Sequence, residues 1–371
     1  MTATPELAIV LGTRPEIIKL APIVRACERR GHPYTLVHTG QHYSERLDGT
    51  FFDQLDLPSP DHRLGVGSGT HGEQTGAMLA GLDGVLRTVD PDVVLVQGDT
   101  NSALAGALAA SKLPVELGHV EAGLRSFDRE MPEETNRVVA DRVADQLFAP
   151  TTTAATQLRR EGIDADRVFV TGNTVVDALR RHLDIARSRS RVLDDLGLVA
   201  SEFALLTAHR PRNVDDPERF ARLLDGVAAA AAESDLEVVY PVHPRAEERI
   251  ADLDSPLPDR IRVIDPLDYL DFLRLEEAAR FVMTDSGGVQ EEACVLGVPC
   301  LTLRENTERP ETVDVGANRL VGVDPKAVRN GARALRAEAA EWPNPFGDGS
   351  AAERVLDALC DRPTAEPEAP R

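Results

Sequence analysis

Residues 93–120 read VVLVQGDTNSALAGALAASKLPVELGHV, and this stretch decides the fold class. Two short apolar runs, at 93–97 and 115–119, flank an alanine-rich segment at 101–112. The runs are apolar nearly throughout rather than alternating, which is typical of parallel strands covered on both faces, and the segment between them has the composition of a helix. The stretch therefore predicts a strand–helix–strand unit with two parallel strands.

The same alternation of apolar runs and amphipathic stretches continues to both ends of the chain. Further strands are expected at 7–11, 34–38, 146–149, 168–170, 204–208, 238–242, 262–264, 281–284, 300–303 and 320–321. Helical patterns lie between the strands of the first half at 16–30, 72–87, 133–143 and 152–161. We therefore expect an α/β protein with two doubly wound Rossmann-like domains.

The boundary between the two domains is expected near Thr171. The N-terminal domain would span 1–170 and the C-terminal domain 171–360, and the tail at 361–371, rich in Pro, Ala and Glu, is expected to be disordered. Ligands of such sheets bind beyond the carboxyl ends of the strands. Two facing domains therefore predict a central cleft, with the functional residues at strand ends.

Length and composition exclude several classes of protein. The 371 residues suit two domains, no apolar run reaches the roughly 18 residues of a membrane span, and the N-terminus lacks the basic segment of a signal peptide. The cysteines Cys27, Cys294, Cys300 and Cys360 have no metal-ligand spacing, so no metal site is expected. Free thiols suit a reducing cytoplasm, so we expect a cytoplasmic protein with no membrane partner.

The net charge of −21 comes from 62 acidic and 41 basic residues, and lysine occurs only as Lys19, Lys112 and Lys326. Such an acidic surface repels nucleic acid, so no nucleic-acid partner is expected. One explanation is an ordinary acidic composition. The explanation that we favour is adaptation to a halophilic, salt-rich cytoplasm, where salt screens the repulsion between carboxylates.

The turn after the first strand, GTRPEIIK at 12–19, predicts an anion site. Pro15 fits the first turn of a helix, and free N–H groups with the helix dipole favour an anion there. Arg14 and Lys19 add positive charge for a phosphate. The alternative is a strand–helix turn with two solvated cations.

The segment GSGTHG at 67–72 matches the GxGxxG pattern of dinucleotide-binding proteins. What precedes it, at 61–64, is not a convincing strand, and Asp92, at about the right distance further on, lies before a strand rather than at the end of one. Dinucleotide binding is therefore not expected here, and the chain also lacks the GxxxxGK[ST] pattern of a P-loop.

Carboxylates follow two of the central strands and open a helix. Asp99 and Glu121 each follow an apolar run, and Glu133 follows Pro132 at a helix start. Asp99 and Glu133 also fit structural roles, as a helix N-cap and as a dipole partner. Carboxylates that converge from neighbouring strand ends can perform acid–base chemistry. Binding of Mg²⁺ is the less favoured alternative.

The second half supplies two further groups at strand ends. His209 follows the strand at 204–208, where a structural role is the alternative for a lone histidine. The serine and glycines of TDSGGVQEE, at 284–292, would present backbone N–H groups to a diphosphate at a helix N-terminus. Glu292, about one turn into that helix, would lie near ribose hydroxyls.

Together these segments resemble the non-hydrolysing UDP-N-acetylglucosamine 2-epimerases, over about residues 7–357. The matching motifs are GTRPEIIKLAP at 12–22, TGQHYSE at 39–45, VQGDTNSALAG at 96–106, GHVEAGLRSFDREMPEETNR at 118–137, GNTVVDAL at 172–179, YPVHPR at 240–245, TDSGGVQEEA at 284–293 and RENTERPETVDVGANRLVG at 304–322. The resemblance implies a GT-B type fold. It also implies elimination of UDP to 2-acetamidoglucal and re-addition on the other face of C2, without NAD or another cofactor. A homodimer is expected from the resemblance alone.

The resemblance also implies roles for individual residues. It places phosphate binding on Arg14 and Lys19 and ribose binding on Glu292. The catalytic residues that it implies are Asp99, Glu121, Glu133 and His209. The other substrate- or UDP-binding positions that it implies are Gln41, His42, His243, Phe272 near uracil, Ser286, Gly287, Gly288 and Arg309.

The chain departs from the family pattern at two places. Many members carry an acidic residue three positions after the cleft histidine, where this chain has Arg212, and the segment 126–131 is shorter than in bacterial members. The short form is similar to that of archaeal-type members of the family and of relatives that act on UDP-2,3-diacetamido-glucuronate, whose carboxylate could bind Arg125, Arg129 or Arg212. A GT-B glycosyltransferase and a catalytically inactive sugar-nucleotide sensor are two further candidate functions.

We predict that the thermal midpoint of unfolding rises between low and molar KCl, because salt screens repulsion among the 62 acidic side chains. Differential scanning fluorimetry over a KCl series measures the midpoint. A midpoint that does not rise would rule out halophilic adaptation.

Overall fold

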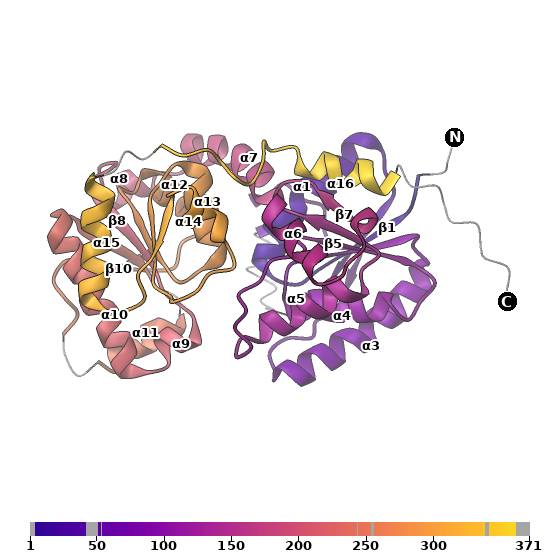
Figure 1. Cartoon of the computed structure of the whole chain (residues 1–371), viewed down its shortest axis with the longest axis horizontal. Coiled ribbons are helices and arrows are strands. Elements are labelled where there is room, and N and C mark those ends of the chain that lie inside the picture. The colour runs from indigo at the N-terminus through magenta and orange to yellow at the C-terminus, as the bar shows by residue number, and fades with distance from the viewer. Residues whose placement is uncertain are drawn as a thin grey trace. The chain divides into compact units, whose positions relative to one another are not determined.

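The computed structural model describes residues 4–41, 51–52, 54–242, 244–253, 256–337 and 341–360. The chain forms two compact units (Figure 1). Unit 1 comprises Met1–Ala178 and Phe346–Arg371, and unit 2 comprises Leu179–Pro345. Each unit is a parallel sheet covered by helices, as the sequence predicts. None of the helices within the described residues is long and apolar enough to cross a membrane.

The sheet of unit 1 has the strand order β3-β2-β1-β4-β5-β6-β7, with every pairing parallel. Its strands are β1 (Leu7–Leu11), β2 (Tyr34–His38), β3 (His62–Arg63), β4 (Val93–Gln97), β5 (Glu116–Val120), β6 (Gln146–Ala149) and β7 (Val168–Val170). Its helices are α1 (Arg14–Arg30), α3 (His71–Val89), α4 (Asn101–Ala110), α5 (Pro132–Val143), α6 (Thr152–Arg160), a 3₁₀ turn at Ala165–Arg167, the start of α7 (Thr174–Arg189) and α16 (Ala351–Cys360). The two-residue strand β3 was not expected, and it lies at the edge of the sheet before the glycine-rich loop.

The register of β4 and β5 positions the loops that follow them. Leu95 pairs with Gly118, and Gln97 pairs with Val120. A Cβ atom at Gly118 would lie 2.6 Å from Leu95 Cδ2 and 3.0 Å from Phe148 Cε2, so only glycine lets the neighbouring side chains close over β5. Because both strands are parallel and end in register, the residues after Gln97 and Val120 leave the sheet at the same edge.

Small residues let α4 pack closely on this sheet. Eight of its ten residues are buried, and a Cβ atom at Gly106 would lie 2.7 Å from Val96 Cγ1. The alanines of α4 join β4 and part of α3 in one apolar core. The helix therefore lies beneath its neighbours rather than at the surface, which explains why its sequence lacks a polar face.

Unit 2 repeats this architecture with the strand order β10-β9-β8-β11-β12-β13, again with every pairing parallel. Its strands are β8 (Phe203–Thr207), β9 (Glu237–Pro241), β10 (Ile261–Ile264), β11 (Val282–Thr284), β12 (Cys300–Thr302) and β13 (Asn318–Leu320). Its helices are the rest of α7, α8 (Val192–Leu196), α9 (Pro211–Val214), α10 (Pro217–Ser234), α11 (Pro244–Ala251), α12 (Tyr269–Ala278), α13 (Gly287–Leu296), α14 (Pro310–Asp314) and α15 (Pro325–Ala337).

Successive residues of β8 enter opposite cores. Phe203 and Leu205 pack with α12 and α13 on one face of the sheet. Ala204 and Leu206 pack with α10 and α15 on the other face, where the two long helices lie side by side (Figure 1). Helices on both faces are the property that defines a doubly wound sheet.

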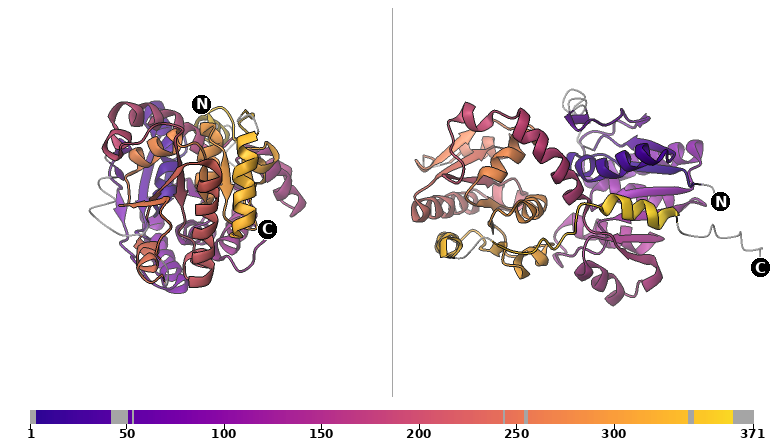
Figure 2. Two further views of the ribbon diagram at one scale, coloured as in Figure 1. Left: turned by 90° about the vertical axis from the view of Figure 1, so that its left-hand side faces the viewer. Right: turned by 90° about the horizontal axis from the view of Figure 1, so that it is seen from above.

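The division of the chain differs from the predicted boundaries. The first unit ends at Ala178 rather than near residue 170, and α16, expected in the second domain, packs on α1 in unit 1 (Figures 1 and 2). Arg30 Nη1 lies 2.7 Å from Asp357 Oδ1 across this contact. The amphipathic pattern of α16 requires an apolar partner, but it does not specify which sheet supplies that partner. The predicted disordered tail, 361–371, lies outside the described residues.

We predict that Asp177→Ala loosens α16. The Asp177 carboxylate accepts hydrogen bonds from the amides of Ala351 (3.2 Å) and Ala352 (3.1 Å) in the first turn of α16. Loss of such a cap costs about 1 kcal/mol. Amide hydrogen exchange of α16 is expected to quicken accordingly. Asp357→Ala, which removes an exposed ion pair, is the control and should change exchange little; equal exchange in both variants would contradict the capping role.

Candidate functional site

The predicted carboxylates of unit 1 gather at one edge of its sheet. Asp99 follows β4 and Glu121 follows β5, whose last residues are paired. The first turns of α5, which also contain Glu133, approach the same loop, because Asn136 Nδ2 donates to the Asp99 carbonyl oxygen at 2.9 Å. The sheet edge thus brings together groups that lie far apart in the sequence.

Glu121 is held on both of its carboxylate oxygens. Lys19 Nζ lies 2.7 Å from Oε1 and 2.8 Å from Oε2, and the Gln97 amide also donates to Oε2. Both Lys19 and Glu121 are buried, so the ammonium neutralises a carboxylate that would otherwise be costly to bury. Glu121 also has a φ of 68°, in the left-handed region that non-glycine residues adopt uncommonly. Lys19, expected to bind phosphate, therefore contacts a carboxylate in this structure.

Asp99 and a neighbouring loop are joined through one arginine. The Arg137 guanidinium bonds the Asp99 carboxylate and lies 2.6 Å from Glu134 Oε2. Glu134 in turn accepts hydrogen bonds from the amides of Ser126 (2.9 Å) and Phe127 (3.0 Å). Neither Arg137 nor this role of Glu134 was expected from the sequence. The only local signal was their spacing of three residues on one helix.

Glu133 differs from the other two carboxylates. It is half-buried, and its side chain makes no hydrogen bond or ion pair within the described part of the chain. An uncommitted carboxylate next to committed ones is the group most free to accept a proton.

The anion site predicted at the start of α1 is filled by the protein itself. Glu16 Oε2 accepts from the Gly12 amide (3.0 Å) and Thr13 Oγ1 (2.8 Å), and Oε1 accepts from Thr100 Oγ1 (2.6 Å). Burial raises the pKa of Glu16 to about 7, against the lowering effect of these hydrogen bonds. Arg14 stays exposed above the Phe51 ring, 5.8 Å from its centroid. The turn therefore offers the Arg14 guanidinium to an anion, but not the Gly12 amide.

Two further predicted residues lie near this edge. Gln41 is buried, and its Oε1 accepts from the amide and the hydroxyl of Ser102, both at 2.9 Å. This contact ties the end of β2 to α4. His42 lies outside the described residues.

His209 of unit 2 forms a pair with Asp285. Its Nδ1 lies 3.1 Å from Asp285 Oδ1, and its side chain is 44% exposed. Burial opposes ionisation of Asp285, but hydrogen bonds from His209, the Arg210 amide and Asn213 outweigh burial and hold its pKa below the ordinary value. Asp285 thereby fixes the ring so that Nε2 points away from it. Asp285 lies within the TDSGGVQEE motif, but its sequence position alone indicated no role.

The predicted diphosphate site forms the start of α13. Ser286 is the N-cap of this helix, and its amide donates to Thr284 Oγ1 at 2.9 Å. The amides of Gly287 and Gly288 lie in the first turn, where no intrahelical acceptor exists. They can donate to an anion, and the helix dipole favours one there.

Arg309 adds a positive charge beside this turn. A Cβ atom on Gly287 would lie 3.6 Å from Arg309 Cζ, so the guanidinium reaches the helix start. Its Nε donates to buried Glu291 Oε1 at 2.5 Å, which orients the group. Arg309 and α13 thus form one cationic corner in unit 2.

Glu292 lies behind this corner, facing a second carboxyl group. It is mostly buried, and Glu276 of α12 is completely buried with neither side-chain oxygen hydrogen-bonded within the described residues. Burial, with the charge of Glu292 as the second cause, raises the pKa of Glu276 well above its ordinary value. Phe272, also on α12, packs partly buried against the core. His243 lies outside the described residues.

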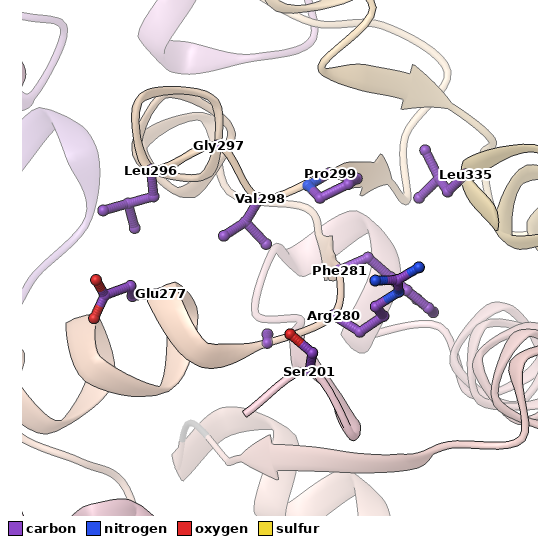
Figure 3. A pocket seen from close by; sticks show the side chains of 10 residues that line it. Ser201, Glu277, Arg280, Phe281, Leu296, Gly297, Val298, Pro299 and Leu335 are labelled. Carbon is purple, nitrogen blue, oxygen red and sulfur yellow. The ribbon is translucent and has the colours of Figure 1, made fainter. Parts of the chain in front are cut away.

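The pocket drawn in Figure 3 lies elsewhere in unit 2. Its walls include Ser201, Phe281 and Pro299, which precede β8, β11 and β12. It therefore opens at the amino ends of the strands, and none of the predicted site residues line it. Within the described residues, no group of three or more His, Cys, Asp or Glu side chains could hold a metal ion.

Sequence comparison identifies relatives over nearly the whole chain. The family model for UDP-N-acetylglucosamine 2-epimerase matches residues 25–360. A UDP-N-acetylglucosamine 2-epimerase of Methanocaldococcus jannaschii is 49% identical over 95% of this chain and 98% of its own length. A UDP-2,3-diacetamido-2,3-dideoxy-D-glucuronate 2-epimerase of Pseudomonas aeruginosa is 39% identical over 95% of this chain and 99% of its own.

Solved structures agree with these matches. The crystal structure of the Methanocaldococcus jannaschii enzyme in complex with UDP-GlcNAc and UDP superposes with a TM-score of 0.89, at 49% identity, and covers 95% of this chain and 99% of that one. A UDP-GlcNAc 2-epimerase from Neisseria meningitidis bound to UDP-GlcNAc has a TM-score of 0.88 at 31% identity, and covers 96% of this chain and 100% of that one. The likeness extends over both units.

We predict that Lys19→Met strongly destabilises unit 1. The substitution leaves Glu121 buried without its ammonium partner, and breaking a buried ion pair in this way costs about 3–5 kcal/mol. Urea unfolding followed by circular dichroism measures the loss. Lys112→Met removes an exposed lysine and serves as the control. If both variants unfolded at the wild-type urea concentration, the ion pair would not contribute to stability.

Proposed function

The chain belongs to the UDP-N-acetylglucosamine 2-epimerase family, and we propose that it reversibly converts UDP-N-acetylglucosamine into UDP-N-acetylmannosamine. The observation that carries this proposal is the 49% identity, over 95% of the chain, to an archaeal enzyme of that name whose crystal structure holds UDP-GlcNAc and UDP. The clustered carboxylates of unit 1 and the cationic corner of unit 2 provide the groups that such an isomerase needs.

We propose that the reaction proceeds by elimination and re-addition. A base removes the proton from C2, the C1–O bond breaks with its electron pair going to UDP, and a C1–C2 double bond forms 2-acetamidoglucal. A proton then returns to the other face of C2 while a UDP oxygen re-forms the bond to C1. Atoms and charge balance without an oxidant, so the sequence requires no NAD.

Glu133 is the base that the contacts favour. Glu121 is engaged on both oxygens by Lys19 and Gln97, and Asp99 is engaged by Arg137. These two carboxylates suit a static role, in which their negative charge stabilises a cationic C1. Glu133, with no such partner in the described residues, is free to take the proton from one face of C2. Because re-protonation occurs on the opposite face, a second carboxylate of the cluster shares the proton transfer.

The departing diphosphate calls for positive charge and N–H donors. His209 is oriented by Asp285, so that Nε2 can donate a proton or a hydrogen bond. The amides of Gly287 and Gly288, with Arg309, suit the negative charge that develops on the leaving group.

A uronate substrate is the second candidate, because the Pseudomonas aeruginosa relative that acts on one is 39% identical. Such a substrate needs a cation for its carboxylate. Arg125 is buried and bonded to Asp141 at 2.7 Å and to Glu161 at 2.7 Å, so it cannot serve. Arg129 and Arg212 remain at the surface. The higher identity to the UDP-N-acetylglucosamine 2-epimerase, 49% against 39%, favours UDP-N-acetylglucosamine over the uronate as the substrate.

The setting of the enzyme is also a proposal. The net charge of −21 supports a salt-rich cytoplasm as its working environment. The family resemblance supports a homodimer.

Proton NMR of UDP-N-acetylglucosamine with the protein, in D₂O with molar KCl and no NAD, tests the proposal. We expect UDP-N-acetylmannosamine to appear with deuterium at C2. Glu133→Gln should show neither product nor exchange while still binding UDP, and Glu130→Gln, at an exposed neighbouring site, is the matched control. The uronate substrate is assayed in parallel. Turnover of the uronate alone would replace the proposed substrate, and turnover of neither would overturn the proposed function.

A further inference from the structure

A completely buried histidine lies beneath the carboxylate edge of unit 1. His119 belongs to β5, two residues before Glu121, and its side chain is 1% exposed. Its Nδ1 lies 2.7 Å from Asp141 Oδ1 on α5, and its Nε2 lies 2.8 Å from the Gly98 carbonyl oxygen. Neither the family resemblance nor the proposed mechanism uses this residue.

Both ring nitrogens of His119 therefore face acceptors. A carboxylate of a buried aspartate and a backbone carbonyl can only accept hydrogen bonds. In either neutral tautomer, one ring nitrogen would turn its lone pair toward an oxygen lone pair. Only the doubly protonated ring satisfies both contacts, so the geometry requires an imidazolium.

The surrounding charges agree with a cation at this position. Asp141 Oδ2 also lies 2.7 Å from Arg125 Nη1, and Arg125 Nη2 lies 2.7 Å from Glu161 Oε2. With His119 charged, two cations face two carboxylates and the cluster is neutral. A neutral ring would leave an uncompensated negative charge where three of the four side chains are almost fully buried.

Through Gly98, this cation reaches the loop that carries Asp99. Gly98 has a φ of 71°, its amide donates to the Val120 carbonyl at 3.0 Å, and its carbonyl accepts from His119. Both polar groups of Gly98 are thus tied to β5. The contacts fix how the loop bearing Asp99 leaves the sheet relative to Glu121, which follows β5.

We propose that His119 is a positioning residue, a buried imidazolium that pins the Gly98–Asp99 turn against the end of β5 and so holds Asp99 and Glu121 in a productive arrangement. Its kinetic consequences rest on the proposed function, whereas its charge and contacts do not.

The proposal has a defined pH dependence. Burial alone would lower the pKa of His119, but the charge and hydrogen bond of Asp141 outweigh burial and raise it, against a smaller opposing effect of Arg125. A group whose pKa is raised on folding contributes its full stabilisation below the ordinary pKa and loses it as pH rises through the raised value. The turn should therefore be held most firmly below the ordinary pKa of histidine and released as pH rises through the raised pKa of His119.

The first measurement needs no substrate. Nitrogen-15 NMR of protein labelled at its nine histidines, with His119 assigned by its absence in His119→Gln, reports the protonation of each ring nitrogen. We expect both His119 nitrogens to be protonated at pH 7 and to titrate above free histidine. In Asp141→Asn, the titration should move to lower pH. A neutral His119 ring at pH 7 in the wild type would overturn the proposal.

The second measurement separates positioning from general stability. His119→Gln should lower kcat by about tenfold or more with KM changed less than about twofold, because an interaction used only in the transition state is lost. In Asp141→Asn, the alkaline limb of the kcat profile should move to lower pH. The matched control is His182→Gln, since His182 is also completely buried but belongs to unit 2.

The outcomes distinguish the two proposals. Equal losses of kcat in His119→Gln and His182→Gln would show that His119 has only a structural role and would overturn the positioning proposal. Absence of epimerisation by the wild type would overturn the proposed function alone, because the ring titration is measured without substrate.

Discussion

The parallel pairing of β4 with β5 is the constraint on which the rest of unit 1 depends. It ends both strands at the same edge, so the loops bearing Asp99 and Glu121 start side by side. The pairing is possible because Gly118 leaves room for Leu95 and Phe148 over β5. The same pairing places His119 within reach of Gly98, so the scaffold and the charged groups depend on one register.

This geometry buries charged side chains. The cost of burying them is offset by oppositely charged groups or hydrogen-bond donors in the same unit. Glu121 has Lys19, Asp141 has His119 and Arg125, and Glu16 has the Gly12 amide with two hydroxyls. Such groups are costly to bury unless paired, and once paired they lose their freedom to move. The resulting rigidity is what an active site requires, since transition-state charge is best stabilised by groups that are already in place.

Glu276 is the exception in unit 2. It has no hydrogen-bond partner within the described residues, and the neighbouring Glu292 adds repulsion to the effect of burial. Burial first, and the charge of Glu292 second, raise the pKa of Glu276 and so favour its neutral form. The sequence singled out Glu292 through its motif, but no pattern marked Glu276, on a different helix, as its neighbour.

The sequence by itself determined most of the elements and the strand ends at which the candidate site residues lie. Short apolar runs mark strands and apolar residues at helical spacing mark helices, and both are local properties of the chain. The ends of those runs therefore located Asp99, Glu121 and His209 without a structure. The two-residue strand β3 was not predicted, because an edge strand of two residues is too short to show a hydrophobic pattern.

Only the tertiary structure decided which charged groups meet. Lys19 and Glu121 are 102 residues apart, and the contact between Arg29 and the returning α16 joins residues 324 apart. Hydrophobic periodicity predicts that one face of a helix packs on an apolar surface, and a buried carboxylate requires a paired group. Neither property identifies which residues form the partner. The partner is set by the winding of the chain, which is a property of the whole fold rather than of any segment.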